Sequence, residues 1–166
     1  MSAESRPPAW QDELAAIIGA RAHGQAAEIL PRLRELDARH PQVAEINHQL
    51  AWTCDTLERD ADAELYYGKA VALGLPPNEL AGALLGLGAV LRRRGQLDRS
   101  AEILRAGQRQ FPAHREFDAF LALTLHAQGR HAAALQLIIE TLCATTEDPG
   151  LTSYQRALRH EAARLH

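Results

Sequence analysis

The side chains with the clearest potential for chemistry lie near the end of the chain, where His160 and Glu161 are neighbours. Zinc-binding helices of one hydrolase class carry His-Glu-x-x-His, because two histidines one turn apart can hold the same ion. Arg164 occupies the place of the second histidine, so the pattern is incomplete. Six further histidines form no pair spaced by four residues on a helix: His23, His40, His48, His114, His126 and His131. We therefore expect no metal and no cofactor, unless folding brings histidines from different segments together.

Glycines and cysteines offer two other kinds of chemistry. Gly82, Gly86 and Gly88 could suggest a phosphate-binding loop, but no strand precedes them and their spacing fits no nucleotide motif. We interpret these glycines as contacts between helices. Cys54 and Cys143 have no C-x-x-C spacing, so they are expected to be buried, reduced thiols. These patterns predict a protein that is not an enzyme.

A run of three arginines, Arg92 to Arg94, is the strongest local concentration of positive charge. Basic residues in the last turn of a helix are favoured by the helix dipole, which explains the run without a ligand. The same edge could instead bind a small anionic ligand or RNA, and we keep this as the alternative function.

The composition defines the fold class. Alanine and leucine supply 56 of 166 residues, whereas valine and isoleucine supply 10, which favours helices over strands. A net charge of −3 excludes a nucleic-acid binder held by overall positive charge. Residues 1–8 show no secretory signal, and no apolar run is long enough to span a membrane. The expectation is an all-α, cytoplasmic protein.

The chain also contains an internal repeat. A shift of 34 residues aligns Leu87-Gly88 with Leu121-Ala122 and Gly95 with Gly129. An earlier copy, marked by Leu50-Ala51, lies 37 residues before the next one, and a weaker copy precedes it. A period of this length is typical of stacked helical hairpins.

Each copy divides into two amphipathic helices joined by a short turn. We expect one domain over 1–166, consisting of a divergent hairpin (8–40), three repeats (41–77, 78–112, 113–147) and a closing helix (151–166). Asp60 and Asn78 are predicted to cap helices, and Thr152 with Gln155 to form a capping box. Pro31 predicts a kink or a late helix start.

These residues resemble the tetratricopeptide repeat: Leu-Gly or Leu-Ala, then Ala or Ser before a large apolar residue, then Pro, every 34 residues. The family's tryptophan is missing, since Asn47, Leu84 and Asp118 stand at its position. The run 84–92 and the segments 120–131 and 154–158 are similar to a small bacterial type, tetratrico peptide repeat group 5, which has no assigned activity.

The resemblance implies a right-handed α-α superhelix that binds a protein or peptide partner on its concave face. Trp52 could anchor the partner or could pack between helices, and the closing helix could cover part of the groove. Carboxylate-clamp binding is not expected, because the required Lys and Asn set is missing. Self-association through an apolar end of the stack is a further expectation. The predicted groove residues are His48, Trp52, Asp55, Leu85, Ala89, Arg92, Ala119, Leu123 and His126.

Overall fold

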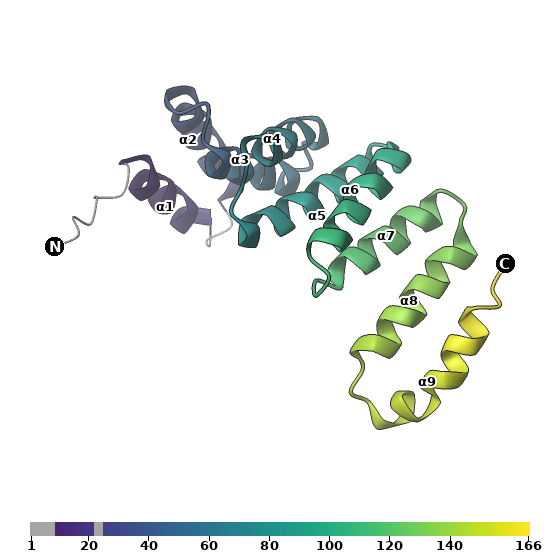
Figure 1. The fold of residues 1–166 in the computed structure, drawn as a ribbon. Coiled ribbons are helices and arrows are strands. Elements are labelled where there is room, and N and C mark those ends of the chain that lie inside the picture. Colours follow the sequence, from purple (N-terminus) through teal and green to yellow (C-terminus); the bar gives the residue numbers. More distant parts are fainter. Residues whose placement is uncertain (1–8, 22–24) are drawn as a thin grey trace. The chain divides into compact units, whose positions relative to one another are not determined.

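The computed structural model describes residues 9–21 and 25–166, and all regular secondary structure in this part is helical. Figure 1 shows the helices following one another along the chain. Their bounds are α1 (Ala9–Arg21), α2 (Ala26–Arg39), α3 (Ala44–Thr56), α4 (Asp60–Leu73), α5 (Pro77–Arg93), α6 (Leu97–Gln110), α7 (Glu116–Ala127), α8 (His131–Thr145) and α9 (Pro149–Ala162). The all-α prediction is therefore confirmed. Residues 1–8, on which the secretory-signal expectation rests, lie outside the described residues.

The predicted hairpins correspond to helix pairs. Helices α1 and α2, α3 and α4, and α7 and α8 pack against each other, and α9 packs against α8. The α5–α6 pair is joined by Ser100 Oγ, which donates to the carbonyl oxygen of Gly88 at 2.7 Å. Packing divides the chain into two compact units, Met1–Gly86 and Leu87–His166, so that α5 begins in one and ends in the other.

The turn between the two helices has the same geometry in three copies. The residues at its centre, Glu58, Gly95 and Gly129, have φ values of 56°, 73° and 77°. In each copy the next N–H donates to the carbonyl five residues earlier, for example from Arg130 to Leu125 at 2.9 Å. This is the Schellman arrangement, which favours glycine at the positive-φ residue. The sequence repeat is therefore also a repeat of turn geometry, with a glutamate in place of one glycine.

Helix starts differ from the predictions in detail. Helix α4 begins at Asp60 itself, and α5 begins at Pro77, so neither Asp60 nor Asn78 occupies the N-cap position. Helix α9 is capped by Asp148, whose Oδ1 accepts from the N–H of Leu151 at 2.8 Å. The predicted Thr152–Gln155 capping box is wrong, because the helix begins earlier, at Pro149. Proline suits the first helical position, where no N–H is needed.

The first hairpin also differs in detail. Helix α2 begins at Ala26, so Pro31 lies inside the helix and does not delay its start. Of the two outcomes expected at Pro31, the late start is wrong, because a proline in the second turn removes one backbone hydrogen bond without preventing the helix, and the kink stays a prediction.

Glycines allow close approach between helices at two of the three predicted positions. A Cβ added at Gly88 would lie 2.6 Å from Leu104 Cδ2, and one at Gly86 would lie 2.4 Å from Tyr67 Cζ. Real Cβ atoms do not come this close, so both positions require glycine for the packing observed. Nothing lies within 4 Å of a Cβ at Gly82, and the helix-contact interpretation fails there. None of the described helices is both long and apolar enough to cross a membrane.

Candidate functional site

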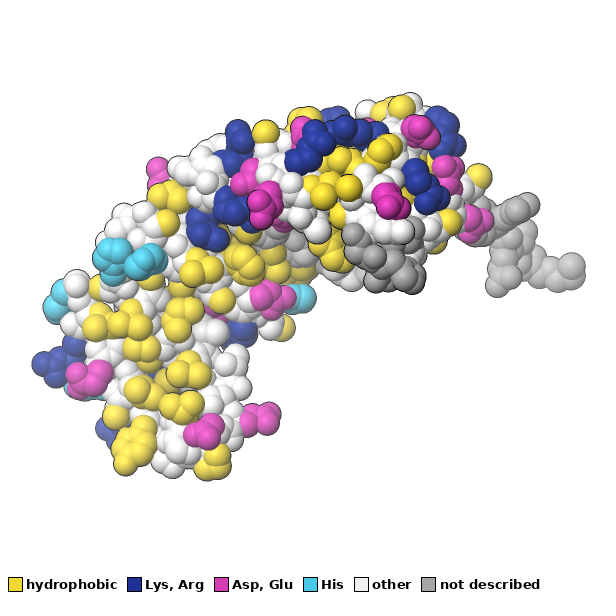
Figure 2. Space-filling model, turned by 180° about the vertical axis from the view of Figure 1, so that it is seen from behind, with side chains coloured by type: hydrophobic (Ala, Val, Ile, Leu, Met, Phe, Trp, Pro, Cys, Tyr) yellow, Lys and Arg dark blue, Asp and Glu magenta, His cyan; other side chains and the backbone are white. Residues whose placement is uncertain are grey.

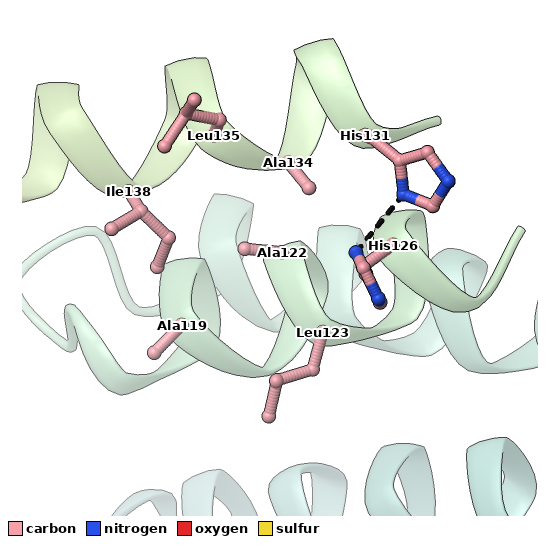
Figure 3. A pocket seen from close by; sticks show the side chains of 8 residues that line it. All are labelled: Ala119, Ala122, Leu123, His126, His131, Ala134, Leu135 and Ile138. Atoms are coloured by element: carbon pink, nitrogen blue, oxygen red, sulfur yellow. Dashed lines mark hydrogen bonds between the residues drawn. The ribbon is translucent and has the colours of Figure 1, made fainter. Parts of the chain in front are cut away.

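The C-terminal unit contains an apolar groove between α7 and α8 (Figure 3). Its volume is about 260 Å³. Four side chains come from each helix: Ala119, Ala122, Leu123 and His126 from α7, and His131, Ala134, Leu135 and Ile138 from α8. No residue of α9 lines the groove, so the closing helix leaves it open. The two histidines lie at one end, and Ala119 and Ile138 lie at the other.

Large apolar side chains around this groove are exposed. Leu123 is 51% exposed, Leu135 is 50% and Ile138 is 40%, and Leu142 extends the exposed row along α8. Figure 2 shows hydrophobic side chains gathered over the C-terminal helices, with histidine nearby. Exposed apolar side chains that cluster on one surface mark interaction sites more often than scattered ones do. The groove is therefore the strongest candidate for binding in this unit.

The polar end of the groove is a histidine pair. His126 Nδ1 and His131 Nδ1 lie 3.0 Å apart, with ring centroids 4.5 Å apart and planes inclined by 55°. Both side chains are exposed. In the part of the chain that the structure describes, no group of three or more His, Cys, Asp or Glu side chains is placed to hold a metal ion.

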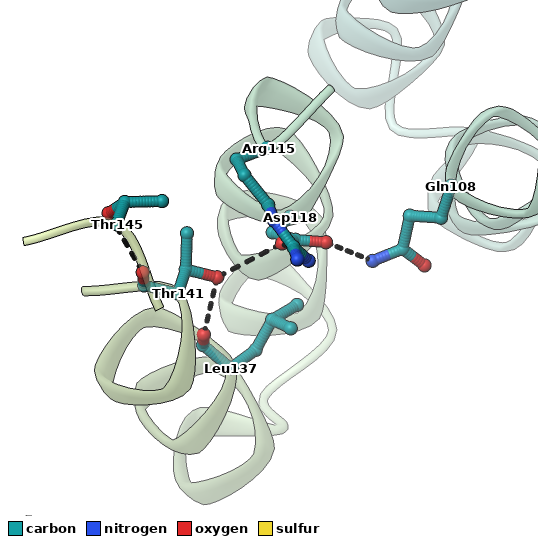
Figure 4. Close-up of polar contacts among 6 residues, drawn as sticks. All are labelled: Gln108, Arg115, Asp118, Leu137, Thr141 and Thr145. Atoms are coloured by element: carbon teal, nitrogen blue, oxygen red, sulfur yellow. Dashed lines mark hydrogen bonds and ion pairs between the residues drawn. The ribbon is translucent and has the colours of Figure 1, made fainter. Parts of the chain in front are cut away.

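A buried carboxylate on α7 connects this helix to its neighbours (Figure 4). Asp118 is 8% exposed, and its Oδ1 accepts from Gln108 Nε2 of α6 at 2.7 Å. Its Oδ2 accepts from Thr141 Oγ1 of α8 at 3.1 Å and lies 3.5 Å from Arg115 Nη1. A buried charge is stable only when it is paired and hydrogen-bonded, and here one carboxylate connects three helices.

In the N-terminal unit, two predicted groove residues are engaged with neighbouring side chains. His48 Nδ1 lies 3.2 Å from Glu79 Oε2, and the His48 side chain is only 12% exposed. Asp55 Oδ2 accepts from the hydroxyl of Tyr67 at 3.4 Å. Trp52 is 49% exposed, which agrees with a side chain on the outer face of α3, and Leu85 is half-buried. Of these four residues, Trp52 offers the most surface to a partner.

A second pocket lies in the same unit, between α1 and α3 and near the start of α5. It has a volume of about 260 Å³ and is more polar than the α7–α8 groove. Its lining residues are Trp10, Gln11, Leu14, Ala15, Ile18, Glu45, Gln49 and Glu79. Glu79 also contacts His48, so part of the polar lining already serves the packing of this unit.

The remaining predicted residues lie in the C-terminal unit. Leu123 and His126 line the α7–α8 groove, and Ala119 is half-buried at its other end, whereas the prediction placed these three residues on a concave face built from first helices. Ala89 is 8% exposed and offers almost no surface to a partner. Arg92 is half-buried in the last turn of α5, which is the position that the dipole argument favours.

Five of the eight residues that line the α7–α8 groove were not predicted: Ala122 on α7, and His131, Ala134, Leu135 and Ile138 on α8. The prediction considered only first helices of each hairpin. A signal existed, because Leu135, Ile138 and Leu142 follow helical three- and four-residue steps, as one face of a helix does. The histidine pair does not form a recognisable spacing motif in the sequence, because its two members lie on different helices and are separated by a turn.

Comparison with known proteins identifies the class to which this arrangement belongs. No curated protein matches the sequence significantly. The family described as "Tetratrico peptide repeat" matches residues 44–165, which is most of the chain. The chain therefore belongs to the tetratricopeptide repeat family, and this membership supports a general role in protein interaction.

Solved structures agree on the fold. The crystal structure of YrrB, a TPR protein with an unusual peptide-binding site, is similar with a TM-score of 0.73 and 17% identity, covering 90% of this chain and 75% of that one. A MamA RS-1 ArsTM double mutant is similar with a TM-score of 0.68 and 16% identity, covering 93% and 94%. At these identities the similarity concerns the fold alone.

Proposed function

We propose that this protein is a non-enzymatic interaction module and that its α7–α8 groove binds an apolar helix or peptide of a partner protein. The observation that carries the proposal is the exposure of Leu123 and Leu135, each about half exposed, on opposite sides of one groove. Complete burial of a fully exposed leucine is worth roughly 1.5–3 kcal/mol, so covering the exposed half of each side chain is worth about half of that. A partner that covers both therefore gains a substantial part of its binding free energy from them.

The dimensions of the groove favour a peptide over a small-molecule ligand. Its volume of about 260 Å³ is smaller than that of most ligand pockets, which occupy roughly 300–1,000 Å³. The lining has exposed apolar side chains from two helices, as expected for the helix-in-groove mode, in which a few anchors three or four residues apart enter the groove. The peptide-binding site of YrrB lends support, as a property of that protein.

A matched set of substitutions tests the groove. Leu123→Glu and Leu135→Glu place a charge within it, whereas Leu65→Glu places the same charge on α4, at a leucine that is 53% exposed. Partners cross-linked to the protein in its own cells are compared between the three variants and the wild type. We expect Leu123→Glu and Leu135→Glu to lose partners that Leu65→Glu keeps, with far-UV circular dichroism unchanged. Retention of every partner by both groove variants would contradict the proposal.

The N-terminal unit is tested separately through Trp52. If its exposed ring anchors a partner, Trp52→Ala weakens the binding free energy by about 2 kcal/mol or more, as truncation of a hot-spot tryptophan does. Loss of thermal stability without loss of partners would instead assign Trp52 to packing.

The occupant of the groove could also be a second copy of the chain. Sedimentation equilibrium distinguishes this case. A wild-type dimer that dissociates in the Leu135→Glu variant but persists in the Leu65→Glu variant would identify self-association through the groove.

A further inference from the structure

His126 and His131 come from different helices but face each other through the same ring atom. His126 lies in the last turn of α7 and His131 is the first residue of α8. The turn between them is held by the N–H of Arg130, which donates to Leu125, and by Gly129 in a positive-φ conformation. The two rings are therefore presented by a defined turn between two packed helices.

The separation of the two nitrogens, which is that of a hydrogen bond, also allows both nitrogens to coordinate one metal ion. Zinc–nitrogen bonds are about 2.0–2.1 Å long, so two imidazole nitrogens on one ion lie roughly 2.9–3.4 Å apart at right to tetrahedral angles. The observed Nδ1–Nδ1 separation is 3.0 Å. Both rings are exposed, so an ion can reach them from solvent.

We propose that His126 and His131 bind one zinc-type divalent metal ion through their Nδ1 atoms. Imidazole nitrogen suits Zn²⁺ and its late transition-metal neighbours and does not suit Mg²⁺ or Ca²⁺, which prefer oxygen. Water completes the coordination in the isolated chain. The ion lies at the polar end of the α7–α8 groove, where its open positions face whatever the groove holds.

Binding requires a change of tautomer but no net loss of protons from neutral rings. In the metal-free pair one Nδ1–H donates to the other Nδ1, whereas the ion needs a lone pair on both. The ring that donates must therefore carry its hydrogen on Nε2 instead, where the N–H can donate a hydrogen bond to water. Protonated imidazole has no free lone pair, so acid pH opposes binding.

The charged groups of the neighbouring elements do not line the groove. Arg130 lies in the connecting turn and lines a separate pocket with Asp98 of α6, and Asp98 accepts from Gln128 Nε2 at 2.8 Å. On α9, which packs against α8, Arg159 donates to the carbonyl oxygen of Cys143, and Glu161 lines another pocket on α9.

Calorimetric titration with Zn²⁺ near pH 7.5, on a chain without affinity histidines, tests the site. We expect one equivalent to bind, with affinity at least about tenfold lower in His126→Gln and in His131→Gln, because each substitution removes one of the two ligands. His114→Gln is the matched control, because His114 is an exposed histidine whose Nδ1 faces a glutamate, Glu116, at 2.8 Å. Mg²⁺ is the control ion.

The imidazole nitrogen resonances give a second, independent reading of the wild-type protein. Zn²⁺ should move the Nδ1 signals of both rings together and leave each Nε2 protonated, a change that lost packing alone would not produce. Zinc binding that survives either glutamine substitution, or the absence of saturable binding below about 1 mM, would overturn the proposal.

Discussion

Asp118 of α7 accepts a hydrogen bond from Gln108 of α6, with Oδ1 and Nε2 2.7 Å apart. The same connection occurs in the N-terminal unit, where Asn47 Nδ2 of α3 donates to Asp37 Oδ1 of α2 at 3.1 Å. In each pair the two residues are ten positions apart in the sequence. One member of each pair, Asn47 or Asp118, stands at the position where the repeat family carries tryptophan. Part-buried amide–carboxylate pairs therefore join consecutive hairpins at this repeat position in both units.

The Asp118 network predicts a large effect of its removal. Asp118→Ala leaves Gln108 without its acceptor and removes one of the two acceptors of Thr141, whose hydroxyl keeps the carbonyl oxygen of Leu137 at 2.8 Å. We expect a loss of about 2–3 kcal/mol in unfolding free energy. Asp118→Asn keeps the size and one acceptor oxygen, so its loss should be about half as large. Urea denaturation of the three proteins measures the difference. A value for Asp118→Ala within about 0.5 kcal/mol of the wild type would show that the network adds nothing.

The helices and their pairing could be predicted because the signals are local. Alanine and leucine favour helices, and Gly95 and Gly129 mark where two of them end. The histidine pair could not be predicted in this way, because the separation of His126 and His131 depends on how the turn directs α8. Ala89 is buried although it was expected to face the groove, since exposure of a small residue depends on its neighbours as well as on its helix face.

The three equivalent turns predict that adding a glycine at the positive-φ position stabilises the protein and that removing one destabilises it. Glu58 adopts φ 56°, which costs an L-residue about 1–2 kcal/mol, so Glu58→Gly should raise the unfolding free energy by about 0.5–1 kcal/mol. Gly129→Ala should lower it by about 1 kcal/mol, although nothing lies within 4 Å of the added Cβ. Gly68→Ala is the control, because Gly68 lies inside α4 with equal space and no positive φ, and alanine should stabilise it. Thermal unfolding of the three variants gives the sign of each effect, and destabilisation by Glu58→Gly would contradict the turn argument.

Gly107 predicts a steric effect instead of a backbone effect. A Cβ at this position would lie 2.1 Å from Phe117 Cε1, and Phe117 is fully buried where α6 meets α7. Gly107→Ala should therefore destabilise the C-terminal unit by about 1–3 kcal/mol, despite alanine's better helix propensity. The double variant Gly107→Ala with Phe117→Leu should show a coupling free energy of at least about 0.5 kcal/mol, because the smaller side chain relieves the clash. Additive effects of the two substitutions would mean that the helices separate easily at this point.

Cys54 predicts a thiol that is protected from reaction. It is fully buried, and burial raises the pKa of its thiol, with Asp62 acting in the same direction and Arg34 and Arg59 opposing it. A raised pKa lowers the thiolate fraction at a given pH, and only the thiolate reacts with iodoacetamide. In a Cys143→Ser background, we expect Cys54 to be alkylated only as fast as the chain opens.

Thr152→Cys adds an exposed thiol on α9 as the internal reference. This thiol should react rapidly, and its rate should increase as the pH rises from about 7 toward 8.5. Peptide mass spectrometry measures both sites in one sample, and alkylation of Cys54 at the rate of the introduced thiol would show that α3 exposes it in the folded state.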